Sequence, residues 1–357
     1  MDMGSLVGQG ASIFSSPDQI ISKWKTLADA HPQWVSYESI GKSVKGKDIW
    51  LFKIGNPSSG KVMYDGVPHG GEAGGTEILY KFTKWLLESK DPKAEHILRW
   101  NYHLIIPVLN VDSVANRRQN MRESYVLSDG RVIDVPYGVD LNRNGIYGWG
   151  QSGSSDPENP YEYRGAWAGS EPETQAYHNA VGKYRPEIYI DTHNGDGEYL
   201  KHYSDTELEH NITAIKNYYE EKQGVTDPYF VFRGGVGGYI SVDADGSWNA
   251  SGWLWETAKW ENMNSTLEDW LETYYPKAFP AILAFAESVE KKPSGDFAII
   301  SPDYSWLIYL VSIVSIVIIL LASSLLIWKN RVKHKIDTSR NGAATSALEF
   351  EYRSRGK

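Results

Sequence analysis

The sequence predicts an α/β fold: a single domain with a mixed, mostly parallel β-sheet flanked by helices, plus one C-terminal transmembrane helix. Two observations lead to this prediction. Short, dense apolar runs such as "YHLIIPVLN" and "EIYIDTHN" are typical of strands covered on both faces, and helical patterns lie between them. Separately, about 21 consecutive uncharged residues, from Leu307 to Ile327, give a helix of roughly 32 Å, long enough to cross a bilayer.

Composition and charge narrow the class of protein. The chain has 357 residues, of which 41% are hydrophobic and 23% charged, and this balance is typical of a globular protein rather than a disordered one. A net charge of -9, with no cationic cluster before roughly the last thirty residues, argues against nucleic acid as a partner. Cysteine is absent, so a transition metal must be held by histidine and carboxylate side chains.

The first half of the domain reads as an ordered series of elements. After an N-terminal extension, residues 1–15, the cap-like "SPD" and apolar residues at helical spacing predict a helix from Ser16 to Ala30. The β-rich stretches "WVSYESIG" and "KDIWLFKIG" follow, separated by a turn-like "KSVKGK", and "KVMYDG" is a further short strand. The stretch "GTEILYKFTKWLLES" then has one apolar face, which predicts a helix packed on the sheet.

The C-terminal part divides into four segments. A last helix, Pro276 to Lys291, is expected to close a catalytic domain that spans residues 16–290, and residues 291–304 form a linker. Residues 305–328 are the predicted transmembrane helix, bracketed by Trp306 and Trp328, and residues 329–357 are a basic and polar tail.

The charges next to this helix predict its orientation. Lysine and arginine residues between positions 329 and 335 place that end in the cytoplasm, so we expect a single-pass membrane protein with an extracytoplasmic catalytic domain. The start "MDMGSLVGQGASIFSS" has neither a basic beginning nor a long apolar segment. Two topologies therefore stay open: a natural start further upstream, or a helix that inserts as a C-terminal tail.

A candidate metal site begins in the glycine-rich stretch "GVPHGGEAGGTEILY". His69 and Glu72 stand three positions apart, so both side chains can point the same way from a turn, and the glycines leave room for a substrate. A third ligand is expected at His193 in "YIDTHNGDG", because ligands in α/β proteins gather at the carboxyl ends of strands. Asp191, two residues before His193, could alternatively take an outer-shell role beside the ligands.

This set of ligands suits hydrolysis. Two neutral imidazoles and one carboxylate leave zinc with a net positive charge and an open position for water. Glu256 lies in the apolar, aromatic stretch "GWLWETAKW", where desolvation raises the pKa of a carboxyl group toward a range useful for a general base. The alternative is that Glu256 is simply a carboxylate at a helix start or on an edge strand.

Two arginine-containing stretches are candidates for substrate binding. In "GVDLNRNG", Asn142 and Arg143 are well suited to gripping a carboxylate through several hydrogen bonds. In "ANRRQNMR", Arg117, Arg118 and Arg122 are candidate cations for a developing oxyanion. Alternatively, these arginines are ordinary surface charge.

The order of these pieces resembles the zinc metallocarboxypeptidase family, which includes the pancreatic carboxypeptidases. The resemblance spans roughly Pro17 to Val289. It is carried by His69-x-x-Glu72, "NVD" at Asn110 to Asp112, Asp140-x-Asn142-Arg143-Asn144, "SEPET" at Ser170 to Thr174, His193 after a strand, and Glu256 near the domain end.

The resemblance implies roles for these residues. One Zn²⁺ per chain would be bound by His69, Glu72 and His193, and Glu256 would be the general base and proton shuttle for attack by water. The protein would be a membrane-anchored metallocarboxypeptidase that hydrolyses the C-terminal peptide bond of peptides or proteins.

The resemblance also implies how the substrate is held. Asn142 and Arg143 would anchor the terminal carboxylate, and Arg118 would polarise the scissile carbonyl, with Arg117 or Arg122 as alternatives after a small shift. The tyrosine that closes over the substrate in the family stays unassigned between Tyr229 and Tyr239. Asp243 and Asp245 are candidates for a pocket that favours a basic terminal residue, or for turn caps.

Two other functions stay open from the sequence. A cell-envelope amidase or endopeptidase would act on wall peptides with the same zinc site. A catalytically inactive, membrane-anchored binding protein would use its many aromatic side chains, among 14 Trp and 23 Tyr, to recognise glycans or peptides. In each case the lipid bilayer is a partner through the C-terminal helix, and nucleic acid is not.

Overall fold

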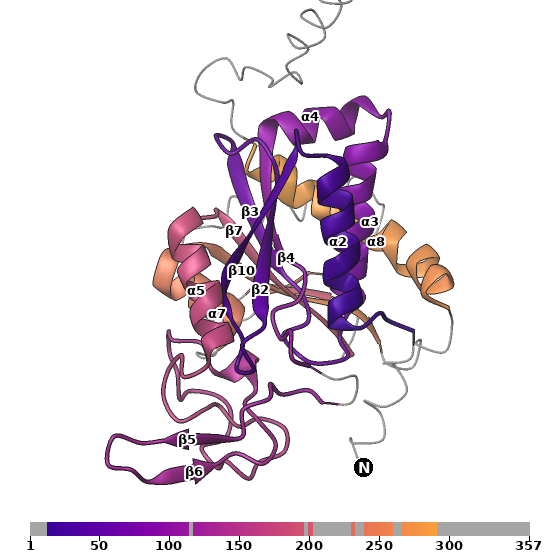
Figure 1. Cartoon of the computed structure of the whole chain (residues 1–357). Helices are drawn as coiled ribbons and strands as arrows, with labels where there is room; N and C mark the ends of the chain where they lie inside the picture. Colours follow the sequence, from indigo (N-terminus) through magenta and orange to yellow (C-terminus); the bar gives the residue numbers. More distant parts are fainter. Residues whose placement is uncertain are drawn as a thin grey trace, which may run out of the picture. The chain divides into compact units, whose positions relative to one another are not determined.

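The structure is a computed structural model that describes residues 13–113, 117–195, 199–202, 230–232, 239–259 and 266–290 (Figure 1). The chain divides into two compact units, Met1–Phe297 and Ala298–Lys357. The predicted linker, transmembrane helix and tail, residues 291–357, lie outside the described residues, as does most of the N-terminal extension. No helix within the described ranges combines the length and the apolar character that crossing a bilayer requires.

The centre of the first unit is a mixed eight-stranded sheet, in the order β1-β2-β4-β3-β7-β10-β8-β9. Its strands are β1 (Val35–Lys42), β2 (Asp48–Gly55), β3 (Gly60–Asp65), β4 (Asn101–Ile106), β7 (Ile188–Gly195), β8 (Tyr199–His202), β9 (Phe230–Phe232) and β10 (Ser251–Lys259). The four neighbours β4, β3, β7 and β10 are parallel, whereas β1, β2 and β8 join antiparallel. The predicted mixed, mostly parallel sheet is confirmed.

Helices cover both faces of this sheet, as the apolar strands predict. In Figure 1, α2, α3 and α8 lie on one side of the strands, and α5 and α7 lie on the other. The helices are α2 (Pro17–Ala30), α3 (Gly74–Glu88), α4 (Pro92–Trp100), α5 (Pro172–Tyr184), α7 (Ile240–Trp248) and α8 (Leu267–Ser288). The strands β3 and β4 are therefore almost completely buried.

The first and last helices of the domain can be compared with the helices predicted from the sequence. The predicted first helix is confirmed, with Ser16 as a capping residue that accepts a hydrogen bond from Gln19 N. The predicted last helix is wrong at its start: α8 begins at Leu267 rather than at Pro276, which lies inside it. A cap at Thr266 and the burial of Trp270 stabilise these first turns, although proline disfavours a helix interior.

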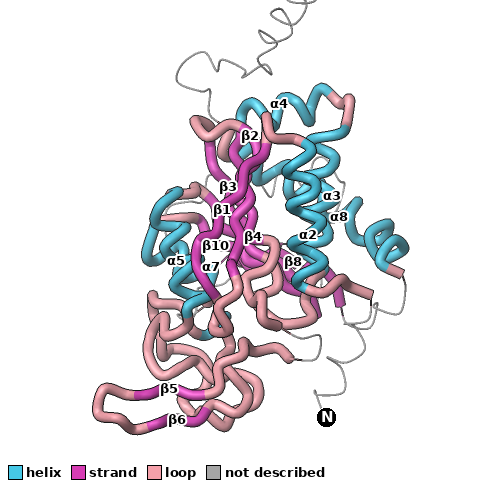
Figure 2. The backbone as a smooth tube through the Cα atoms, viewed as in Figure 1, coloured by secondary structure: helices cyan, strands magenta, loops and turns pink. Residues whose placement is uncertain are grey.

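A long loop region connects β4 to α5. It carries the small two-stranded sheet of β5 (Ser124–Val126) and β6 (Val132–Asp134), and the single-turn helix η1 (Leu141–Arg143). Figure 2 shows that loops surround these short elements from β6 to the start of α5. We call residues 144–171, between η1 and the start of α5, the η1–α5 loop.

Candidate metal centre

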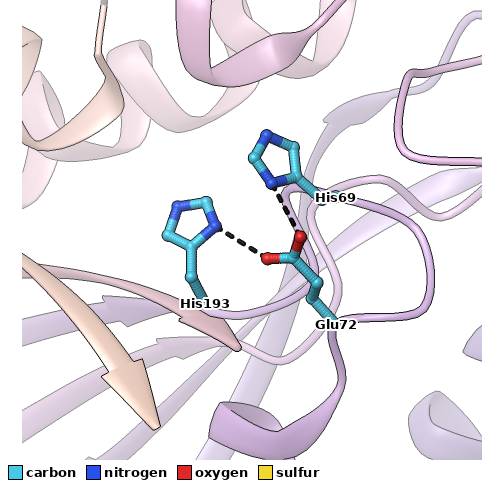
Figure 3. Close-up of side chains that lie close together, drawn as sticks. All are labelled: His69, Glu72 and His193. Atoms are coloured by element: carbon cyan, nitrogen blue, oxygen red, sulfur yellow. Dashed lines mark hydrogen bonds and ion pairs between the residues drawn. The ribbon is translucent and has the colours of Figure 1, made fainter. Parts of the chain in front are cut away.

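Three predicted ligands converge at one point (Figure 3). The Glu72 carboxylate lies between two imidazoles: its Oε1 is 3.1 Å from His69 Nδ1, and its Oε2 is 2.9 Å from His193 Nδ1. All three side chains are buried, and one donor atom from each lies within 4.8 Å of the others. The structure therefore brings His69, Glu72 and His193 together, although 121 positions separate Glu72 from His193.

Glycines allow the two sides of this site to approach each other. His69 and Glu72 lie in the turn between β3 and α3, where Gly71 has a φ of 87°, a value that favours glycine. At Gly75, in the first turn of α3, an added Cβ would lie 2.3 Å from Thr192 Cβ on β7. The glycine run thus lets α3 begin directly against the strand that carries His193.

Each histidine is backed by a carboxylate on its far side. His69 Nε2 lies 3.0 Å from Asp140 Oδ1, and His193 Nε2 lies 2.9 Å from Asp191 Oδ2. With Nε2–H donating to these oxygens, Nδ1 of each ring faces Glu72. Loss of the Nδ1 proton would leave a lone pair there for a metal, an arrangement found around protein-bound metals. Asp191 thus has the outer-shell position considered from the sequence. Asp140 was not predicted in this role, although it begins the Asp-x-Asn-Arg motif.

The charges of the site favour a divalent cation. Burial disfavours the charged form of Glu72, but His69 and His193 outweigh this effect and hold the pKa of its carboxyl group well below the usual range. Burial likewise opposes ionisation of His193, yet Asp191 and Glu72 hold the pKa of its imidazole well above the usual value. One carboxylate and two Nδ1 atoms form a donor set that fits Zn²⁺. Such a group of three or more occurs once among the described residues.

Glu256 lies next to this group on the neighbouring strand. Its Cα pairs with that of His193 across the parallel strands β10 and β7, so the two side chains leave the sheet on the same face. The side chain is largely buried, with 7% exposed. Because β10 lies between β7 and β8, the alternatives of a helix start or an edge strand are wrong.

The three candidate arginines have different surroundings. Arg118 lies beside the site: its Nη1 is 3.8 Å from Glu72 Oε1, and its Nε is 3.4 Å from Asp140 Oδ2. Arg122 instead donates from Nε to Glu171 Oε2 at 3.1 Å, within the loop region. The Nη2 of Arg117 lies close to Gly138.

Asn142 and Arg143 reach the same site through η1. Asn142 Nδ2 lies 3.0 Å from His193 Nε2, and its Oδ1 accepts a hydrogen bond from Ile240 N at 2.9 Å. Arg143 donates from Nη1 to the Asn142 carbonyl and from Nη2 to Glu162 Oε1, both at 2.9 Å. Its guanidinium also lies 4.4 Å from the centre of the Tyr239 ring.

Two predictions about substrate contacts have different outcomes. Tyr229 lies outside the described residues, whereas Tyr239 is in the described part and lies against Arg143. Asp243 is fully buried and accepts four hydrogen bonds, from Tyr147 N, Tyr177 OH, His178 Nδ1 and Ser247 Oγ. It therefore offers no free carboxylate to a basic terminal residue, and its part in the predicted pocket is wrong.

Comparison with known proteins identifies the domain. Residues 20–252 match the model of a family described as "Zinc carboxypeptidase". This match includes the three candidate ligands and ends before Glu256. Carboxypeptidase A6 of Homo sapiens is 30% identical over 195 residues, which are 53% of this chain and 45% of that protein. Bovine carboxypeptidase B is 27% identical over 198 residues, 52% of this chain and 46% of that protein.

Solved structures show the same fold. Carboxypeptidase A from Helicoverpa armigera superposes with a TM-score of 0.62 at 19% identity, over 77% of this chain and 73% of that one. Thrombin activatable fibrinolysis inhibitor (TAFI) gives a TM-score of 0.64 at 17% identity, over 80% of each chain. The chain spans less than half the length of the curated relatives named above.

Proposed function

The chain belongs to the zinc carboxypeptidase family, and we propose that it hydrolyses the C-terminal peptide bond of peptides or proteins with one zinc ion per chain. The observation that carries this proposal is the convergence of His69, Glu72 and His193, with a carboxylate behind each imidazole. Zinc held there would supply Lewis acidity toward water and the scissile carbonyl.

Glu256 is the proposed general base. Its place beside His193 on the neighbouring strand allows it to take a proton from the attacking water and to deliver that proton to the leaving amine. Its burial limits competition from bulk water.

Three further side chains would hold the substrate. Arg143 still has guanidinium N–H groups beyond the two that donate to Asn142 and Glu162, and Asn142 Nδ2 carries two N–H groups, so together they suit a terminal carboxylate. Arg118 is near enough to Glu72 to stabilise negative charge that develops on the carbonyl oxygen. An internal peptide bond lacks the carboxylate, so this clamp confines cleavage to the chain end.

Product analysis tests the activity. The zinc-loaded chain should release single amino acids in sequence from the C-termini of a panel of short peptides, and a chelator should stop the release. Mass spectrometry that showed internal fragments would instead support an endopeptidase or amidase, and no product from any peptide would contradict the proposal.

We also propose that the protein is anchored in a membrane by residues 305–328, with the catalytic domain outside the cytoplasm. The support is the uncharged run from Leu307 to Ile327 and the basic residues that follow it. Carbonate extraction of membranes should leave the full chain in the pellet, and protease added to intact cells should remove the catalytic domain. Full release of the chain by carbonate would contradict the anchor.

A further inference from the structure

Arg143, the proposed anchor for the substrate carboxylate, already contacts a carboxylate of its own chain. Its Nη2 donates to Glu162 Oε1 at 2.9 Å. The Arg143 side chain is 10% exposed and that of Glu162 is 51% exposed. The ion pair thus joins a largely buried cation at the end of η1 to a half-exposed anion in the η1–α5 loop.

We infer that Glu162 competes with the terminal carboxylate of the substrate for Arg143, and so sets the affinity for free C-termini. This inference rests on the proposed function, because it takes Arg143 to be the carboxylate anchor. Glu162 and a peptide C-terminus present the same chemical group to the guanidinium, and charge-assisted N–H to carboxylate hydrogen bonds are the strongest contacts available to either.

Glu162 is not needed to hold Arg143 in place. The Asn142 carbonyl accepts from Nη1, and the Tyr239 ring lies against the guanidinium. Both contacts come from residues at the site itself, whereas Glu162 belongs to an irregular, exposed loop. The main effect of Glu162 is therefore to place a negative charge beside Arg143, rather than to fix the position of the guanidinium.

The competition is expected to be modest in size. Ion pairs with an exposed partner are weak, since water solvates the carboxylate once it is displaced. A substrate carboxylate can therefore displace Glu162 or share Arg143 with it, at the cost of repulsion between two anions. A neutral terminal amide meets no such repulsion, so Glu162 affects charged and uncharged ligands differently.

Steady-state kinetics of the full zinc-loaded chain test this inference. With an N-acetylated dipeptide as substrate, Glu162→Gln should lower KM by about two- to fivefold and leave kcat unchanged, because glutamine keeps the size but not the charge. Inhibition by the carboxamide of the same dipeptide should stay the same. Glu158→Gln removes an equal charge from an exposed position in the same loop and should change neither value.

A KM that rises or stays constant in Glu162→Gln would overturn the inference, since a rise means that Glu162 positions Arg143. An equal gain in affinity for the carboxamide would overturn it as well. A wild-type chain without activity would instead count against the proposed function. Calorimetric binding of the N-acetylated dipeptide would then still test the competition, with tighter binding to Glu162→Gln as the expected result.

Discussion

Replacing His103 with leucine is expected to make the protein less sensitive to mild acid. His103 lies on β4 and is fully buried, with its ring centre 5.3 Å from that of Phe82 and 6.1 Å from that of Tyr64. Among the described residues, neither ring nitrogen has a hydrogen-bond partner. Burial lowers the pKa of this imidazole from 6.5 to about 3, so the folded protein keeps it neutral where the unfolded chain would protonate it.

The size of the effect follows from this pKa shift. The unfolded chain binds a proton at His103 below about pH 6.5, and the folded protein does so only below about pH 3. His103 therefore leaves the free energy of unfolding unchanged above about pH 6.5 and lowers it progressively as the pH falls toward about 3. Each unit of pH in this window costs about 1.4 kcal/mol, which gives a loss of about 3 kcal/mol between pH 6.5 and pH 4. Leucine cannot take up a proton and avoids this loss.

Urea unfolding followed by tryptophan fluorescence measures the difference. The wild type and His103→Leu should diverge progressively as the pH falls, and other titrating groups cancel in the comparison. His96→Leu removes a histidine that is 48% exposed and lies 2.9 Å from Glu290 Oε1, so it should not reproduce the gain in acid stability of His103→Leu. If His103→Leu followed the wild type in parallel from pH 6.5 to 4, the reasoning would be refuted.

Three further predictions concern the proposed site. Glu256→Gln should keep zinc but lower kcat by about 10²–10⁴-fold, as amino-acid release and metal analysis will show; release at the wild-type rate would exclude it as the base. Asp191→Asn should weaken zinc binding about 10–100-fold, measured by competition with a chromophoric chelator. Asp134→Asn, at an exposed position, should bind zinc as the wild type does. Equal zinc affinities of Asp191→Asn and the wild type would show that Asp191 does not support the metal ligands. Arg143→Lys should raise KM about 10–100-fold for substrates with a free C-terminus, because lysine lacks the paired donors of the guanidinium. Arg131→Lys, at an exposed position, should leave KM unchanged. An unchanged KM in Arg143→Lys would show that Arg143 does not bind the terminal carboxylate.

Local patterns in the sequence were sufficient for much of the fold. The capped helix after Ser16 and the dense apolar runs of β4 and β7 have periodicities that determine their type. His69 and Glu72 were found from their spacing of three positions in a glycine-rich stretch. His193 was found because it follows a predicted apolar strand, and parallel strands end at the same edge of the sheet.

Features that depend on contacts between distant segments were not accessible in this way. The start of α8 is determined by the burial of Trp270, which overrides the usual effect of an internal proline. Glu162 meets Arg143 across 19 residues of irregular chain, and no periodic pattern marks such a pair. The burial of Asp243 against α5 is likewise a tertiary contact, so the sequence reading of Asp243 as a pocket carboxylate failed.

Zinc content measured by native mass spectrometry is the most direct test that His69, Glu72 and His193 bind one metal ion together. The metal-replete wild type and His96→Ala should each carry one zinc ion per chain, whereas His69→Ala and His193→Ala should carry almost none. Full zinc occupancy in either of these two variants, or a wild type without zinc, would contradict the account.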